Sequence, residues 1–227
     1  MRTKPQGVID SLNFRSSQME SYFSDDENYS IETIKGIGVF EPDRWVKEFK
    51  KPLTRNIIEA KILNTSTGLI LPLKRHSRSQ DMQVIEFAGL HGYTDKSMLL
   101  SELLNALMES IQDELITRLD VAIDFKGKIP TRVIRALRKN RRLFVWKNSM
   151  YMKTEKEKST NQNINICMYR KDLKKNDIDY ELHRLEFSFK STYFRNKYKV
   201  ENLEDLYKKM EKTIKKIANF EVIIKPL

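Results

Sequence analysis

The sequence predicts an α+β fold, with a largely antiparallel central sheet and helices packed on one face of it. Several segments carry apolar residues at every second position, which is typical of half-buried strands. Other stretches carry them at helical spacing, and together the elements follow the order β-β-β-α-β-α-β-β-β-α. With 227 residues, 40% of them hydrophobic, the chain is long enough to bury a substantial core.

The expected elements follow in chain order. Residues 1–30 are polar and predict a loosely ordered N-terminal arm with room for one short strand, and residues 31–227 are expected to form a single domain. Pro42 suits the start of a short helix over residues 42–50. The other expected strands are residues 57–63, 68–73, 83–90, 117–125, 143–153, 163–171 and 181–190, and the other expected helices are 96–113, 130–142 and one capped by Asn202.

The central strand, residues 117–125, carries the clearest chemical signal. Its apolar residues point to one face, while Arg118, Asp120 and Asp124 point to the other. Carboxylates placed in this way on a rigid element can hold a hard divalent cation such as Mg²⁺ or Mn²⁺. The alternative is a solvated polar face with a local Arg–Asp pair, because one polar face is normal in an antiparallel sheet.

The same alternation predicts which other side chains share this polar face. They are Arg118, Asp120, Asp124, Tyr151, Lys153, Tyr169, Lys171, Arg184 and Glu186, joined by Glu86 if Ile85 and Phe87 face the core. The set combines acids for a metal, tyrosines for a nucleophile and bases for phosphates, as phosphodiester cleavage by a tyrosine requires. Any single tyrosine in it is also compatible with an ordinary, partly buried sheet residue.

The charge of the chain is uneven. The formal net charge is +11, and residues 126–227 hold 27 Lys and Arg against 12 Asp and Glu. Such a basic half favours a polyanionic partner, nucleic acid before an anionic membrane surface, although a merely soluble lysine-rich surface is the alternative. The segment 130–142 is basic along most of its length, and Arg135, Arg138 and Arg142 are candidate phosphate contacts together with Arg118 and Lys153.

Several classes of function are not expected. The single cysteine, Cys167, cannot form an intrachain disulfide, which fits a reducing cytoplasm, and neither a signal peptide nor an apolar run of membrane-spanning length is visible. The three histidines show no zinc-binding spacing, and no phosphate-binding loop of the G-x-x-x-x-G-K-S/T type occurs.

Three motifs together resemble a known family. They are Thr117-Arg-Leu-Asp-Val-Ala-Ile-Asp-Phe, then Ser149-Met-Tyr-Met with Ile166-Cys-Met-Tyr-Arg-Lys, and then His183-Arg-Leu-Glu-Phe-Ser-Phe-Lys. This pattern looks like that of rolling-circle replication initiators of the staphylococcal-plasmid transfer-replication type and of related replication proteins of filamentous phages. The resemblance covers about residues 84–190.

The resemblance implies a metal-dependent endonuclease and strand transferase that acts on origin DNA through a covalent phosphotyrosine. By motif match Tyr151 takes the place of the nucleophile, Asp120, Asp124 and Glu186 form the acidic site, and Arg184 and Lys171 support the chemistry. The glycine that the family usually has after the tyrosine is missing, since Tyr151 is followed by Met152 and Lys153, so Tyr169, Tyr193 and Tyr198 stay open as alternative nucleophiles. A host helicase and a second copy of the chain are candidate partners.

Two other functions compete with this one. A primase-polymerase also places acids on a small antiparallel sheet, but as D-x-D or D-x-E rather than the D-x-x-x-D found here. A non-enzymatic origin- or RNA-binding module would need only the basic half of the chain. Metal-dependent primer synthesis would favour the first of these, and the absence of nicking would favour the second.

Overall fold

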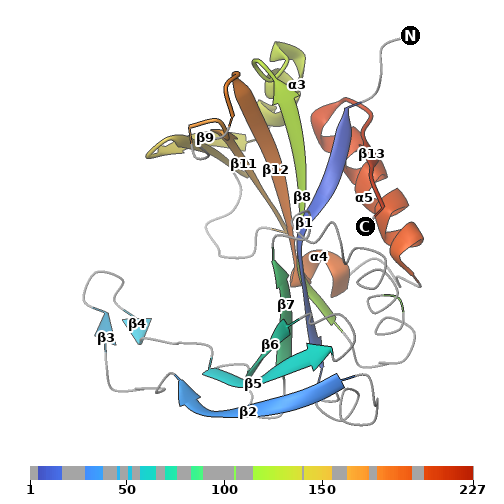
Figure 1. Ribbon diagram of the computed structural model, residues 1–227. Coiled ribbons are helices and arrows are strands. Elements are labelled where there is room, and N and C mark those ends of the chain that lie inside the picture. Colours follow the sequence, from blue (N-terminus) through green and yellow to red (C-terminus); the bar gives the residue numbers. More distant parts are fainter. Residues whose placement is uncertain are drawn as a thin grey trace. The chain divides into compact units, whose positions relative to one another are not determined.

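The computed structural model describes residues 5–16, 29–37, 45–46, 51–52, 57–64, 70–75, 83–88, 105, 115–139, 141–154, 163–173, 178–195 and 202–226. The chain divides into two compact units. The first comprises Met1–Leu12, Ala88–Ser110 and Ile116–Leu227, and the second comprises Asn13–Phe87 and Ile111–Leu115. Their strands are mostly antiparallel and occur with a few helices, which confirms the predicted α+β class (Figure 1).

The first unit is built on a sheet in which neighbouring strands are hydrogen-bonded in the order β1-β8-β12-β11-β10-β9. These strands are β1 (Gln6–Ser16), β8 (Leu115–Lys126), β12 (Leu182–Lys190), β11 (Ile164–Arg170), β10 (Ser149–Thr154) and β9 (Arg141–Trp146), of which residues 13–16 and 115 are assigned to the second unit. Every pairing from β8 to β9 is antiparallel, and β13 (Ile223–Ile224) pairs in parallel with the start of β1. This sheet carries most of the residues singled out in the sequence.

The core of this unit follows from the alternation in the sequence. Leu119, Val121 and Ile123 of β8 lie directly opposite Phe189, Phe187 and Leu185 of β12, and all six side chains are buried. The same unit contains three described helices, α3 (Thr131–Arg138), α4 (Ser191–Arg195) and α5 (Leu203–Ala218), and α4 packs Tyr193 against Phe189 of this apolar face. The buried stripe of α5 consists of Leu203, Leu206, Tyr207, Met210, Ile214 and Ala218.

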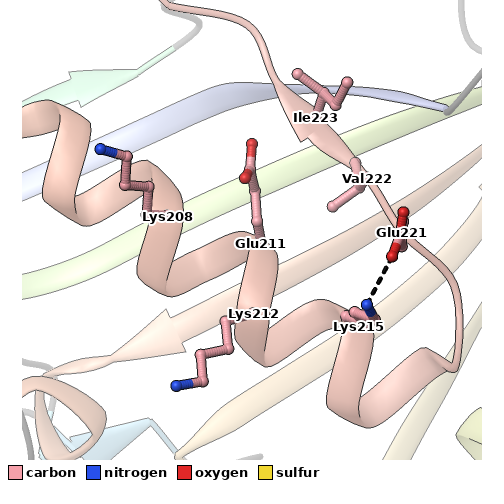
Figure 2. A pocket seen from close by; sticks show the side chains of 7 residues that line it. All are labelled: Lys208, Glu211, Lys212, Lys215, Glu221, Val222 and Ile223. Carbon is pink, nitrogen blue, oxygen red and sulfur yellow. Dashed lines mark hydrogen bonds and ion pairs between the residues drawn. The ribbon is translucent and has the colours of Figure 1, made fainter.

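Local signals fix the ends of α5. The side chain of Asn202 accepts a hydrogen bond of 2.9 Å from the backbone N–H of Asp205, as predicted for its N-cap. Asn219 ends the helix in the left-handed conformation, with a φ of 54°. The chain then returns as β13, whose Ile224 N–H donates to Glu211 of α5, and Lys215 pairs with Glu221 beside it (Figure 2).

Among the described residues of the second unit, four strands are hydrogen-bonded in the order β2-β5-β6-β7, and all these pairings are antiparallel. They are β2 (Tyr29–Ile37), β5 (Ile57–Asn64), β6 (Ile70–Arg75) and β7 (Gln83–Ala88). Two short strands, β3 (Trp45–Val46) and β4 (Lys51–Pro52), form a separate antiparallel pair. The predicted helix over residues 42–50 is therefore wrong at Trp45 and Val46, where an aromatic and a β-branched residue enter a strand instead.

The predicted N-terminal arm contains a strand that is longer than expected. Residues 6–16 form β1, in which Ile9, Leu12 and Phe14 are buried, and the predicted boundary at residue 30 stays a prediction. The polar composition of residues 1–30 predicts an arm. A strand forms there nevertheless, because its stability comes from neighbouring strands that are distant in the sequence and leave no mark on the local composition.

Differences of detail occur in the basic segment. The predicted helix over residues 130–142 ends at Arg138, and Arg141 and Arg142 instead begin β9. The predicted strand over residues 143–153 is two strands, β9 and β10, joined at Lys147 and Asn148, with Lys147 at a φ of 51°. Of the predicted helix over residues 96–113 only Asn105 is described, and it is helical, while the rest lies outside the described residues. No helix in the described part of the chain is long and apolar enough to cross a membrane.

Candidate active site

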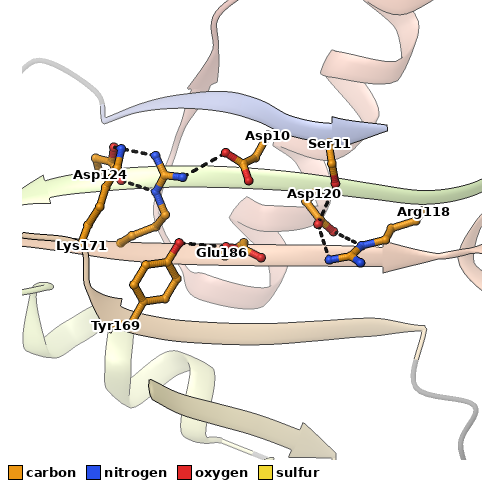
Figure 3. Close-up of polar contacts among 9 residues, drawn as sticks. Asp10, Ser11, Arg118, Asp120, Asp124, Tyr169, Lys171 and Glu186 are labelled. Atoms are coloured by element: carbon orange, nitrogen blue, oxygen red, sulfur yellow. Dashed lines mark hydrogen bonds and ion pairs between the residues drawn. The ribbon is translucent and has the colours of Figure 1, made fainter. Parts of the chain in front are cut away.

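The polar face of the sheet in the first unit gathers the predicted reactive side chains. In the β-ladders Arg184 lies opposite both Asp124 and Tyr169, while Glu186 lies opposite Ala122 and Cys167. Residues directly opposite each other in an antiparallel ladder project to the same face. Figure 3 shows Asp124, Tyr169 and Glu186 together with Asp10 and Asp120 on one side of β1, β8, β12 and β11. Those members of the predicted face whose side chains are described therefore project from the same face of the sheet.

Arg184 forms the centre of the first cluster on this face. Its guanidinium binds Asp124 with two hydrogen bonds, of 2.7 and 2.9 Å, and donates a third of 3.0 Å to Asp10. Lys171 adds an ion pair of 2.8 Å to the same Asp124 carboxylate. Burial opposes ionisation of Asp124, but the hydrogen bonds and charges of Arg184 and Lys171 outweigh it, so the pKa of Asp124 is lowered.

Asp120 forms the centre of the second cluster. Its side chain is only 3% exposed, and both of its oxygens accept hydrogen bonds. Ser11 of β1 donates to one oxygen over 2.8 Å, and Arg118 binds both through contacts of 3.0 and 2.6 Å. The local Arg–Asp pair considered from the sequence is thus present, but it lies on a buried aspartate rather than on a solvated face.

Glu186 lies between the two clusters (Figure 3). The hydroxyl of Tyr169 donates to its Oε2 over 3.3 Å. Burial raises the pKa of Glu186, and the carboxylates of Asp120 and Asp10 raise it further. Burial and the charge of Glu186 raise the pKa of Tyr169 to about 12. Tyr169 is therefore held in the protonated form near neutral pH.

Tyr151 lies one strand further out, on β10. It is opposite Cys167, which is itself opposite Glu186, so all three share the polar face. The neighbouring Cys167 raises the pKa of Tyr151, and burial contributes in the same direction. Tyr151 also contacts Phe144 of β9, with the ring centroids 6.3 Å apart.

The predicted metal ligands are only partly brought together. In the described residues no three His, Cys, Asp or Glu side chains are grouped so that they could hold a metal ion, and Asp124 is occupied by Arg184 and Lys171. Asp120 and Glu186 fit the chemistry better, because the carboxylate of Asp120 raises the pKa of Glu186 and a cation would offset that charge, but Asp120 would have to exchange its contact with Arg118 for the metal ion. Mg²⁺ typically binds through one or two carboxylates together with water and substrate phosphates.

The other predicted residues lie in different places. Arg135 and Arg138 are exposed on α3, and Arg142 is exposed on β9, opposite Lys153 of β10. Tyr193 is buried in α4, with its ring 5.0 Å from that of Phe189 on the apolar face and its hydroxyl bonded to Thr213. The structure therefore does not bring Tyr193 to the polar face.

Some predicted residues cannot be placed. Glu86 lies in β7, but its side chain and that of Lys153 fall outside the described part of the chain, as does Tyr198 entirely. Their roles stay predictions.

Two residues of the site were missed in the sequence. Asp10 and Ser11 are consecutive on β1, yet Asp10 binds Arg184 and Ser11 binds Asp120. The available signal was the pattern Val8-Ile-Asp-Ser-Leu-Asn-Phe14, in which apolar and polar residues mix as in a half-buried strand.

Comparisons with known proteins complete the description of this α+β protein and its tyrosine–carboxylate–arginine site. No family model matches the chain, and no curated protein matches it. One similar solved structure is a rolling circle replication initiator protein from Geobacillus stearothermophilus. It is 16% identical, with a TM-score of 0.47 over 82% of this chain and 74% of that one. A likeness of this degree does not assign a fold family or a function.

Proposed function

We propose that the chain is a replication initiator that nicks DNA at an origin and transfers the strand through a covalent phosphotyrosine. The observation that carries this proposal is the shared polar face, on which Glu186, Asp120 and Arg184 lie with two tyrosines within the motifs of the resemblance. Acids, phenols and cations on one rigid surface are the groups that this reaction needs.

In the proposed step Tyr151 acts as the nucleophile. Its hydroxyl oxygen forms a bond to the scissile phosphorus, and the bond from phosphorus to the 3′ oxygen breaks. The proton lost by the phenol ends on the released 3′ hydroxyl, and the 5′ phosphate stays on the tyrosine. Lys171 lies beside Arg184 and offers an ammonium group for the phosphate, while Arg184 holds Asp124 in place.

Tyr169 is assigned a positioning role in this proposal. Its hydroxyl donates to Glu186, and a pKa of about 12 opposes the loss of its proton. Asp120 and Glu186 would hold the Mg²⁺ or Mn²⁺ ion, whose charge would polarise the scissile phosphate. Origin DNA is the proposed substrate, a host helicase and a second copy of the chain are proposed partners, and the cytoplasm is the proposed location.

The nucleophile is tested by mapping the covalent adduct. The protein is incubated with Mn²⁺ and a pool of randomised single-stranded oligonucleotides, and the modified peptide is identified by mass spectrometry. We expect the adduct on Tyr151 and its loss in Tyr151→Phe, which removes only the oxygen and keeps the ring. Tyr180→Phe, which alters an exposed tyrosine outside the polar face, is the control.

Other results would revise the proposal in defined ways. An adduct retained by Tyr151→Phe and mapped to Tyr169 would exchange the roles of the two tyrosines. Cleavage without any adduct would show hydrolysis in place of strand transfer. Metal-dependent primer synthesis would support the primase-polymerase alternative, and DNA binding without any reaction would support the non-enzymatic one.

The metal site is tested without reference to activity. Because a ligand that binds only the folded state stabilises it, millimolar Mg²⁺ or Mn²⁺ should raise the midpoint of thermal unfolding. At about ten times Kd we expect a rise of about 3–5 °C for a chain of this size. The rise should disappear in Asp120→Asn and Glu186→Gln and persist in the control Asp179→Asn, which alters an exposed acid. An equal rise in all variants would place the cation elsewhere.

A further inference from the structure

Strand β9 exposes an unusual run of apolar side chains. Leu143, Phe144, Val145 and Trp146 are 39%, 47%, 60% and 59% exposed, respectively. β9 is the last strand in the hydrogen-bonded order of its sheet, next to β10. Single exposed apolar residues are normal, but four in succession that include a tryptophan indicate a surface that binds something.

The two aromatic members of the run lie on the polar face. Phe144 is opposite Tyr151, and Trp146 is opposite Ser149, which is itself opposite Tyr169. Leu143 and Val145 lie opposite Met152 and Met150 and so belong to the other face. Since neighbouring strands are about 4.8 Å apart, Trp146 lies about 10 Å from Tyr169 across the sheet. We call Phe144 and Trp146 the aromatic pair.

The surroundings of the aromatic pair are positively charged. Residues 139–154 contain five cations, and no acidic residue occurs among them; the cations are Lys139, Arg141, Arg142, Lys147 and Lys153. Arg142 shares the face of the aromatic pair, because it lies two positions from Phe144 on the same strand. Proteins that bind single-stranded nucleic acid typically combine exposed aromatic rings, on which bases stack, with cationic side chains that lie along the phosphate backbone.

We infer that β9 is a stacking platform for unpaired bases, on which single-stranded DNA leads to the tyrosines of the polar face. The rings of Phe144 and Trp146 stack on two bases, and the adjacent cations neutralise the phosphates. The occupant is a single strand because only unpaired bases expose their faces to an aromatic ring. This inference rests on the proposed function, since it concerns the substrate of the same face.

A second copy of the chain is the competing occupant, because an edge strand can pair with its own copy. Charge argues against it: pairing β9 with β9 would bring two segments of five cations each together. A polyanion removes this repulsion and covers the same apolar area.

Binding is measured without any divalent cation, so that no chemistry contributes. Kd values for a mixed-sequence single strand of about 20 nucleotides and for the corresponding duplex are measured by fluorescence anisotropy. Trp146→Ala should weaken single-strand binding about 5- to 150-fold, equivalent to the about 1–3 kcal/mol of one stacked base, and should leave duplex binding unchanged. Phe144→Ala should act in the same direction, and Trp146→Tyr should retain most of the affinity.

Val145→Ala is the matched control, because Val145 is as exposed as Trp146 and lies on the same strand but on the opposite face. It should leave both affinities unchanged. The chain has only two tryptophans, so a Trp45→Phe background isolates the emission of Trp146, which single-stranded DNA should quench. Circular dichroism melts verify that each variant is folded.

Three results would overturn the inference. They are an equal loss of single-strand and duplex binding in Trp146→Ala, an equal loss in Val145→Ala, and a wild-type dimer that Trp146→Ala converts to a monomer with unchanged DNA affinity. The inference and the proposed function fail separately. Loss of single-strand binding in Trp146→Ala with no adduct on any tyrosine would retain the platform and reject the strand transferase.

Discussion

Glu186 and Asp124 lie on the same polar face, yet their surroundings shift their pKa values in opposite directions. Burial and two neighbouring carboxylates raise the pKa of Glu186, whereas Arg184 and Lys171 lower that of Asp124. The difference lies in the partners: Asp124 is bound by two cations, while the hydroxyl of Tyr169 is a neutral donor to Glu186. At the scale of single residues, the neighbouring groups therefore determine whether the pKa of a carboxyl on this face is raised or lowered.

The opposite shifts predict opposite pH dependences of stability. A carboxyl whose pKa is raised on folding binds protons more tightly in the native state, so its contribution to stability falls as pH rises above the unfolded pKa. Glu186→Gln removes the ionisable carboxyl and with it this pH-dependent loss of stability. The free energy of unfolding of the variant at pH 7 should therefore exceed that of the wild type. The two proteins should converge below pH 4.5, the ordinary pKa of this carboxyl.

Asp124→Asn provides the comparison with opposite sign. The lowered pKa means that ionised Asp124 stabilises the native state at neutral pH, and this contribution is lost as pH falls below 3.8. The variant should therefore be less stable than the wild type at pH 7 and similar to it in acid. Urea denaturation across this pH range measures both differences. If both variants changed stability in the same direction at pH 7, this description of the site would be wrong.

At the scale of elements, local signals define α5 and tertiary pairing defines β9. The cap of α5 at Asn202 follows from the sequence, and the structure confirms it. The sequence predicts that the helix continues through Arg141, but in the structure the chain pairs with β10 from Arg141 onward. Long-range strand pairing overrides helix propensity at this point because the ladder supplies hydrogen bonds that a frayed helix end lacks.

The cap of α5 gives a prediction at this scale. Asn202→Ala should lower the free energy of unfolding by about 1 kcal/mol, because the N–H of Asp205 loses its acceptor. Asn202→Asp and Asn202→Ser keep an acceptor at the cap and should retain most of the stability. Urea denaturation of the three variants at pH 7 is sufficient. Equal losses in all three would show that the Asn202 side chain has another role.

At the scale of the whole molecule, the basic half of the chain presents its charge on several surfaces. Arg135 and Arg138 are exposed on α3 and Arg142 on β9, while Lys208, Lys212 and Lys215 line a pocket beside β13 (Figure 2). Net charge alone does not distinguish these surfaces as binding sites. Two of these three pocket lysines already pair with glutamates, Lys208 with Glu204 and Lys215 with Glu221.

The salt dependence of DNA binding shows which of these basic surfaces contacts the DNA. Removing one cation that binds a phosphate should reduce the slope of log affinity against log salt by about one, because fewer counterions are released. Arg135→Ala, Arg138→Ala and Arg142→Ala combined should flatten the slope by up to about three. The matched control is a triple variant that combines Lys208→Ala, Lys212→Ala and Lys215→Ala. It removes the same formal charge and should change the slope less. Equal flattening in both would mean that only net charge matters, and no change in the arginine triple would place the DNA elsewhere.

The sequence by itself determined which residues share a face. The period of two in the central strand placed Arg118, Asp120 and Asp124 together, and the same reading of later strands placed Tyr151, Tyr169 and Glu186 with them, as the ladders confirm. Periodicity is sufficient for this because the pleat of a strand is a local property.

Only the tertiary structure decided which partners these residues meet. Ser11 reaches Asp120 from 109 positions away, and Asp10 reaches Arg184 from 174 positions away. Three further features also depend on segments that are distant in the sequence. They are the binding of Asp124 by Arg184, the burial of Tyr193 and the position of β9 at the edge of its sheet. Local periodicity fixes the direction of a side chain, but the order of strands in a sheet depends on packing and hydrogen bonding between distant segments, which no local pattern records.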